Sequence, residues 1–196
     1  MFHQIPTAVW NRMQYLEALD NEQRRLGLPV AERLCAITPE GARFIALMAV
    51  AAPRGACLEV GTGGGYSGLW LTLACTERGN KLTTFELDEH KVKTARETFK
   101  EAGVESMIDL VVGDAKDHLH RYQNVAFCFL DAAKSEYIDC YETVLPNMVE
   151  GGMIVADNVI TRKETSEPFI QRVLNDARVD AVMVPIGKGK MLCRKK

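Results

Sequence analysis

The stretch from Cys57 to Gly68, CLEVGTGGGYSG, constrains the fold of this chain more than any other segment. It begins as a mainly apolar strand, and the glycines that follow permit the positive φ angles of a tight turn. The residues after the turn open a helix, whose free N–H groups favour a polar or anionic ligand group. The stretch therefore predicts a strand, a ligand-binding turn and a helix in succession.

Segments typical of strands and helices alternate along the rest of the chain. The apolar patterns and turn residues predict strands at 56–60, 82–86, 107–112, 125–130, 153–156, 181–186 and 190–194. Helices are expected over 7–26, from Thr38-Pro39, from Tyr66 to Gly79, from Asp88 to Gly103, from Ser135 to Gly151-Gly152, and over 166–177.

This alternation predicts an α/β architecture. We expect a Rossmann-like, doubly wound, mostly parallel sheet of seven strands with helices on both faces. The C-terminal hairpin around Gly187-Lys188-Gly189 contributes one antiparallel strand. Residues 1–196 are expected to form a single domain, with residues 1–35 as an N-terminal helical cap. Ligands of such a fold bind beyond the carboxyl ends of the strands.

Composition narrows the classes of partner and compartment. A net charge of −2 over 196 residues gives no indication of a surface for nucleic acid or membrane. The six cysteines are scattered without zinc-site spacing, which suits a reducing compartment. The start of the chain lacks the pattern of a secretory signal, and no apolar run is long enough to span a bilayer. We expect a soluble, cytoplasmic protein.

Acidic residues accompany the glycine turn at the ends of the next two strands. Glu86 ends strand 82–86, where a carboxylate can accept hydrogen bonds from both hydroxyls of a ribose. Asp114 and Ala115 follow the third strand, in a position to border an adenine ring. Taken separately, the glycines could form a simple turn and Glu86 could be a surface acid. Because the glycines and Glu86 occur together with the strand, the turn and the helix in the expected order, they indicate a nucleoside-cofactor site.

The identity of that cofactor is less certain from the turn alone. Gly63 to Gly68 satisfies the GxGxxG pattern of dinucleotide-binding oxidoreductases, so an NAD-dependent dehydrogenase is one alternative. Counted from Gly61, however, Tyr66 stands where the third glycine should be. Glu59 also lies within the strand, where its charge would oppose a pyrophosphate and favour an amino group and a sulfonium. This balance favours S-adenosylmethionine (SAM).

A second group of polar residues occurs where strands 125–130 and 153–156 end. Asp131 follows one strand, Asp157-Asn158 follow the other, and Lys134 lies three residues after Asp131. Two carboxylates and an amide oxygen form a hard ligand set, suited to magnesium first and to calcium or manganese as alternatives. Each part could instead be a capping or turn residue. Their joint occurrence at two neighbouring strand ends favours a metal site.

Together these motifs resemble those of the metal-dependent class I O-methyltransferases, the family of catechol and caffeoyl-CoA O-methyltransferases. The resemblance covers roughly residues 36–194 and rests on EVGTGGGYS at 59–67, FELD at 85–88, FLDAAK at 129–134 and ADNV at 156–159. It implies that Glu59, Gly61, Thr62 and Ser67 hold the methionine end of SAM, and that the segment around Ile37-Thr38 closes over the cofactor. It implies a ribose contact at Glu86 and an adenine contact at Ala115, with Asp114 and Asp131 also among the cofactor-binding residues. The implied metal ligands are Asp131, Asp157 and Asn158.

The resemblance also implies a reaction. A small hydroxylated aromatic acceptor, such as a catechol, would chelate the ion, and Lys134 would remove the proton of the hydroxyl that receives the methyl group. The family also suggests a homodimer. A non-catalytic SAM-binding protein is a further alternative, although the retained Lys134 and metal set argue against it.

Two departures from the family pattern affect the acceptor side. Many relatives have a second acid where this chain has Ala133, and a longer insertion after Val159. The short connection at 160–165 predicts a more open acceptor site.

Overall fold

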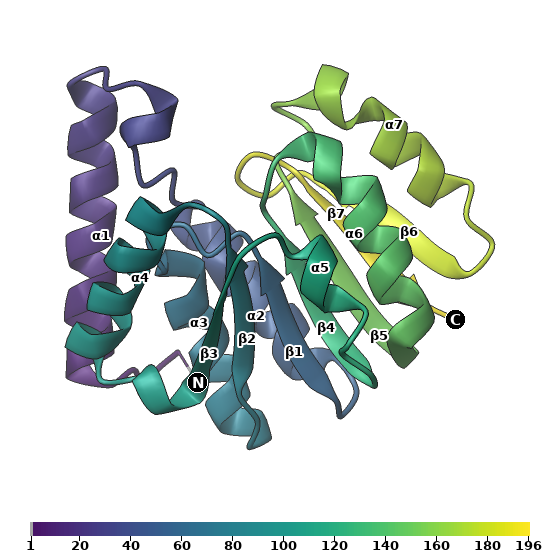
Figure 1. The fold of residues 1–196 in the computed structure, drawn as a ribbon, viewed down its shortest axis with the longest axis horizontal. Coiled ribbons are helices and arrows are strands. Elements are labelled where there is room, and N and C mark those ends of the chain that lie inside the picture. Colours follow the sequence, from purple (N-terminus) through teal and green to yellow (C-terminus); the bar gives the residue numbers. More distant parts are fainter. Residues whose placement is uncertain (1) are drawn as a thin grey trace.

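The computed structural model describes residues 2–196, which are organised around one seven-stranded sheet (Figure 1). Its strands are β1 (Ala56–Val60), β2 (Leu82–Glu86), β3 (Ile108–Val112), β4 (Val125–Leu130), β5 (Met148–Asp157), β6 (Val179–Val184) and β7 (Lys190–Lys195). Their order across the sheet is β3-β2-β1-β4-β5-β7-β6. β7 is antiparallel to β5 and β6, whereas the other neighbouring pairs are parallel. The predicted fold class is confirmed.

The helices alternate with the parallel strands along the chain. They are α1 (Thr7–Arg25), α2 (Pro39–Ala51), α3 (Tyr66–Arg78), α4 (Glu89–Ala102), α5 (Lys116–Leu119), α6 (Tyr137–Val144) and α7 (Lys163–Leu174). The expected N-terminal capping residues are confirmed for α2 and α4. The Thr38 side chain accepts a hydrogen bond from the Gly41 backbone N–H, and the Asp88 side chain accepts from those of His90 and Lys91. No helix within residues 2–196 is long and apolar enough to cross a membrane.

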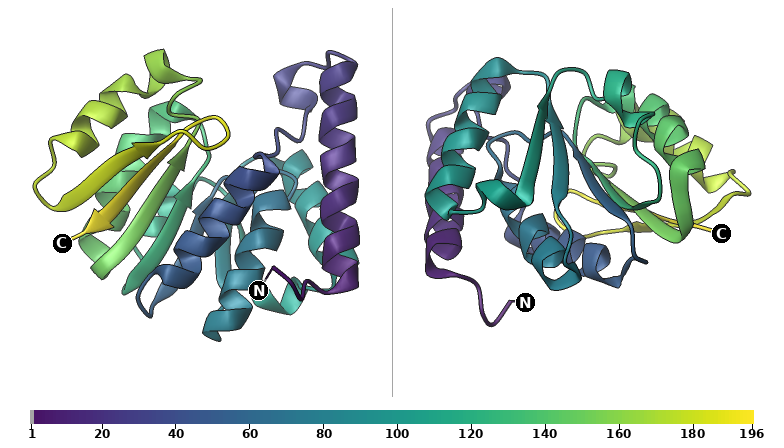
Figure 2. Two further views of the ribbon diagram at one scale, coloured as in Figure 1. Left: turned by 180° about the vertical axis from the view of Figure 1, so that it is seen from behind. Right: turned by 60° about the horizontal axis from the view of Figure 1, so that its bottom comes forward.

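The sheet divides the core into two apolar clusters, one on each face. Helices α2, α3 and α4 cover one face, and α5, α6 and α7 cover the other, as the opposite views in Figures 1 and 2 show. Along β4, Phe127 and Phe129 belong to the first cluster, whereas Cys128 and Leu130 belong to the second. Every residue of β4 is buried, as expected for a central parallel strand covered on both sides.

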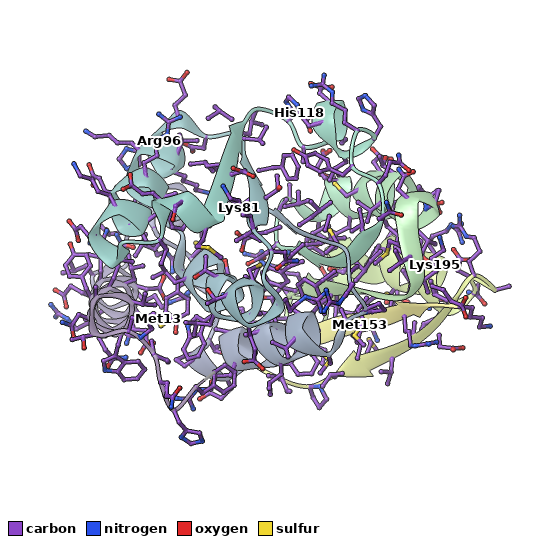
Figure 3. The ribbon with its side chains drawn as sticks, turned by 90° about the horizontal axis from the view of Figure 1, so that it is seen from below. Met13, Lys81, Arg96, His118, Met153 and Lys195 are labelled. Carbon is purple, nitrogen blue, oxygen red and sulfur yellow. The ribbon has the colours of Figure 1, made fainter. Side chains whose placement is uncertain are left out.

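Helix α1 packs outside the first layer of helices, against α3 and α4. Figure 3 shows α1 nearly end-on, with Met13 on the side that faces the other helices. Val9, Met13 and Leu16 of this helix are buried, in agreement with the helical spacing of these apolar residues. Arg12 anchors the same face by donating hydrogen bonds to Thr98 of α4. The predicted N-terminal cap is thus a helix bound to α4.

The structure corrects the prediction between Ser135 and Asp157. The expected single helix is interrupted: α6 ends at Val144, Leu145–Asn147 form a 3-10 turn, and β5 already begins at Met148. Pro146 lies in that turn, where proline cannot continue an α-helix. Gly151-Gly152 were expected to end the helix, but they lie within β5, where the register with β4 shifts at a bulge.

Smaller differences affect the last elements. α7 begins at Lys163 rather than near 166, and β6 spans Val179–Val184 rather than 181–186. Only residues 158–162 therefore connect β5 to α7, and their backbone is tied to the C-terminal hairpin by hydrogen bonds from Ile160 N and Thr161 N to Lys188 O.

Candidate active site

A cavity of about 1150 Å³ opens at the carboxyl ends of β1, β2, β4 and β5. It brings together most residues that the sequence assigned to the cofactor, the metal and catalysis. Those that line it are Ile37, Gly61, Thr62, Ser67, Glu86, Asp114, Ala115, Asp131, Lys134 and Asn158. Glu59 and Asp157 do not line the cavity; both are buried behind its wall. One hollow therefore contains the glycine turn and the residues that follow β4 and β5.

Glu86 is fixed by the backbone at one end of this cavity. Its carboxylate accepts hydrogen bonds from the N–H groups of Gly63 at 2.8 Å, Leu87 at 3.0 Å and Asp88 at 2.9 Å. These bonds hold the carboxylate beside the glycine turn while leaving acceptor capacity for further donors. The arrangement suits recognition of a vicinal diol, such as a ribose.

Gly61 joins the cofactor turn to the polar residues after β4. Its φ is +95°, and a Cβ at this position would lie only 2.4 Å from the Asp131 carbonyl oxygen. The Asp131 N–H in turn donates to the Val60 carbonyl at 2.9 Å. Glycine at position 61 therefore allows the ends of β1 and β4 to approach each other closely, in addition to the cofactor role that the sequence suggested.

Glu59 lies beneath the turn in a buried hydrogen-bonded chain. Thr84 Oγ1 donates to Glu59 Oε2 at 2.7 Å and is 2.6 Å from Thr62 Oγ1. Burial is the main cause that raises the Glu59 pKa to about 7, and the negative charges of Asp131 and Glu86 act in the same direction. No hydrogen-bond partner within residues 2–196 reaches the buried Glu59 Oε1. This carboxyl is thus destabilised when ionised.

Stability is expected to fall with rising pH because of Glu59. The folded-state pKa of about 7 lies above the ordinary 4.5, so the folded protein binds more protons than the unfolded chain between these values. The free energy of unfolding of the wild type should therefore fall, relative to that of Glu59→Gln, by about 2–3 kcal/mol between pH 5 and pH 8. Urea titrations at both pH values measure this, with exposed Glu105→Gln as control. Parallel pH dependences of wild type and Glu59→Gln would contradict it.

Asp131, Lys134 and Asn158 form a polar cluster after β4 and β5, and β1 separates these strands from β2, which Glu86 ends. Asp131 Oδ1 accepts from Lys134 Nζ at 3.5 Å and from Asn158 Nδ2 at 3.2 Å. Burial, followed by the charge of Asp157, raises the Asp131 pKa to about 6. Burial lowers the pKa of Lys134, against the opposing effect of Asp131. The lysine thus lies in the same cavity as the glycine turn, with its proton less tightly held.

Asn158 has two unusual features. Its φ is +62°, in the left-handed region, and its buried Oδ1 has no hydrogen-bond partner in the described part of the chain. A hard cation would satisfy such an oxygen. The Asp131 carboxylate lies in the same cluster, and the Asp157 carboxylate is buried directly before Asn158 in the chain. The donor set therefore fits a divalent metal ion in chemical type.

Tyr137 is a residue that the sequence analysis did not single out. Its hydroxyl is 2.5 Å from Lys134 Nζ and donates toward the carbonyl oxygens of Leu130 and Asp157, at 2.8 and 3.1 Å. It thus links the ends of β4 and β5 to the lysine side chain. The spacing of three residues between Lys134 and Tyr137 on a helical turn was the available signal.

Lys190 is a second residue that the sequence analysis did not single out. It is the first residue of β7 and is fully buried. Its Nζ lies 2.5 Å from Asp157 Oδ1, so Asp157 is held in an ion pair behind the cavity wall. Lys188, by contrast, is half-buried and lines the cavity.

The N-terminal extension also contributes to the cavity, which its sequence did not indicate. Arg24, Val30 and the segment 33–37 line it. The polar end of α1 positions this segment: Gln23 Oε1 accepts from Leu34 N at 2.8 Å, and Asp20 Oδ1 accepts from Ala36 N at 3.2 Å. The segment that was expected to close over the cofactor is therefore held by side chains of the extension.

Comparison with known proteins identifies the family. The O-methyltransferase family model matches residues 11–196. This chain belongs to the O-methyltransferase family. Its membership confirms the enzyme class predicted from the sequence, a SAM-dependent O-methyltransferase, in preference to the NAD-dependent alternative.

Individual relatives of this O-methyltransferase agree with that assignment. A caffeoyl-CoA O-methyltransferase from Stellaria longipes is 30% identical over 162 residues, which are 70% of this chain and 67% of the relative. A catechol O-methyltransferase from Niastella koreensis is 29% identical over 80% of this chain and 73% of its own length. An O-methyltransferase from Bacillus cereus, solved with SAH, superposes with a TM-score of 0.77 at 23% identity, covering 97% of this chain and 91% of that one.

Proposed function

We propose that this enzyme transfers the methyl group of SAM to a hydroxyl of a small aromatic acceptor with vicinal hydroxyls, using Lys134 as general base and a divalent cation. The observation that carries the proposal is the single cavity shared by the glycine turn with Glu86 and by Asp131, Lys134 and Asn158. A cofactor on one side and an acceptor on the other would meet there, and positioning two reactants in this way supplies much of a methyl-transfer rate.

The cofactor half of the proposal assigns roles to the first group. Glu86, with three backbone N–H groups fixing its carboxylate, would accept from the ribose hydroxyls of SAM. Gly61, Thr62 and Ser67 would lie along the methionine end. Ile37, Asp114 and Ala115 would complete the walls, the last two bordering the adenine. Glu59 would act from behind the turn, where a carboxylate favours a cationic ligand.

The acceptor half rests on the second group. Asp131, Asp157 and Asn158 would hold a divalent cation, magnesium in the first instance. When bound there, the cation would lower the pKa of an acceptor hydroxyl. Lys134, whose own pKa is lowered by burial, would take the proton from that hydroxyl. The named relatives that act on catechol and caffeoyl-CoA support an aromatic acceptor of this kind.

The test is methyl transfer to a panel of catechols and matched monophenols, with and without a chelator. We expect turnover of vicinal diols in preference to monophenols, and a decrease on chelation that added magnesium reverses. Turnover that is insensitive to the chelator would contradict the metal-assisted mechanism. Equal turnover of monophenols would contradict the acceptor class, and thermal stabilisation by NAD but not by SAM would contradict the cofactor.

A further inference from the structure

The pairing of β5 with β7 places a lysine directly against one proposed metal ligand. Asp157, the last residue of β5, is the register partner of Lys190, the first residue of β7. Both side chains are 1% exposed, and Lys190 Nζ lies 2.5 Å from Asp157 Oδ1. A buried charged pair at this distance interacts far more strongly than a pair on the surface, because solvent does not screen it.

The surrounding backbone is shaped to accommodate the ammonium group. Position 41, in the first turn of α2, is a glycine, and a Cβ there would lie 3.0 Å from Lys190 Nζ. The oxygen that Lys190 contacts also accepts from the Asn158 backbone N–H at 2.6 Å. Asp157 Oδ1 therefore already accepts from two donors, and one of them, the Lys190 ammonium group, carries a full positive charge.

Both carboxylates of the proposed metal site already face ammonium groups, and the charge of Lys188 also acts on Asp131, against the burial that raises its pKa. Lys134 Nζ lies 3.5 Å from Asp131 Oδ1, and Lys190 Nζ pairs with Asp157. Each of the two carboxylates thus has its own ammonium group. A divalent cation that binds beside Asp131 and Asp157 gains the attraction of two negative charges but meets the repulsion of two positive ones.

We propose that Lys190 is a resident counter-charge at Asp157 that weakens the affinity of this site for a divalent cation. Lys190 thereby determines the metal requirement of the enzyme, because the ion must share Asp157 with a fixed ammonium group. The inference rests on the ligand set of the proposed function, and it predicts that removal of this one charge tightens metal binding.

Titration of the full-length protein with Mn²⁺ alone tests the inference. Electron paramagnetic resonance of free Mn²⁺ gives the dissociation constant without any need for turnover. We expect Lys190→Met to lower that constant more than about tenfold relative to the wild type, since a repulsive charge in contact with a ligand carboxylate is removed. Unchanged or weaker Mn²⁺ affinity in the folded variant overturns the proposal, as does absence of Mn²⁺ binding in both proteins.

Two further variants keep the result interpretable. Lys190→Met leaves Asp157 buried without its partner and can therefore fail to fold. Lys190→Gln removes the charge but retains a donor for Asp157, so it decides the question if the methionine variant is unfolded by circular dichroism. Lys81→Met is the matched control: this lysine is exposed and directly precedes β2, at the opposite end of that strand from the cavity. It should change Mn²⁺ affinity by at most about threefold.

Measurements of SAM binding and methyl transfer on the same proteins separate the two proposals. Intact methyl transfer without tighter Mn²⁺ binding in the variants overturns the role of Lys190 alone. Tighter Mn²⁺ binding in a protein that methylates no acceptor supports the role of Lys190 and contradicts the proposed function.

Discussion

Lys134→Met is expected to reduce kcat for methyl transfer by about 10²- to 10⁴-fold, the usual contribution of a general base, while SAM affinity is retained. Lys134 follows β4 whereas Glu86 ends β2, and β1 lies between these two strands, so removal of the lysine spares the proposed ribose contact. Its pKa is lowered by burial, which is what a base requires to accept a proton near neutral pH. Steady-state kinetics with a catechol, together with calorimetric titration of SAM, measure both quantities.

Lys134→Arg distinguishes a base from a simple positive charge. Arginine retains the charge beside Asp131 but does not lose its proton in proteins, so this variant should be about as inactive as the methionine variant. Arginine activity close to that of the wild type would contradict the role as base.

Tyr137→Phe tests the contribution of the tyrosine hydroxyl to catalysis separately from that of Lys134. The tyrosine hydroxyl contacts Lys134 Nζ, but the lysine remains in this variant, so we expect a smaller loss of kcat than for Lys134→Met. An equal or larger loss would mean that the hydroxyl, rather than the lysine alone, is required for the chemistry.

The sequence alone was sufficient for the parts of the fold that depend on local patterns. Strands 56–60, 82–86 and 125–130 were predicted with the bounds that the structure shows, because each is an apolar run that ends at an acid or glycine. The parallel order then brings the ends of these strands to one edge, which is why the residues after them meet in one cavity. Side chains that directly follow a parallel strand are thus predictable from sequence.

Residues whose burial depends on strand pairing far along the chain were not predictable in the same way. Lys190 looks like a hairpin lysine in sequence, and its burial depends on pairing with Asp157, 33 positions away in the chain. The early end of the helix expected after Ser135 has a local signal in Pro146, but the early start of β5 depends on a bulge at Gly151-Gly152 in its pairing with β4. Contacts across strands thus set the burial of Lys190 and the start of β5, and no local pattern encodes either.

Gly61→Ala is expected to lower the free energy of unfolding by about 3–5 kcal/mol, because two independent penalties coincide. The φ of +95° is unfavourable for alanine, and the new Cβ would lie 2.4 Å from the Asp131 carbonyl oxygen and 2.8 Å from its carbon. Both contacts are with backbone, so no side-chain rotation can relieve them. Urea unfolding followed by circular dichroism measures the change.

Gly79→Ala is the matched control because it isolates the backbone penalty. Gly79 ends α3 with a φ of +69°, and a Cβ there would have no neighbour within 4 Å. This variant should lose only about 1–2 kcal/mol, the cost of a left-handed conformation for an ordinary residue. Equal losses in the two variants would mean that the ends of β1 and β4 separate easily. We expect a larger loss for Gly61→Ala, together with weakened SAM binding in the protein that still folds. That result would show that the conformation of the glycine turn depends on its close contact with Asp131.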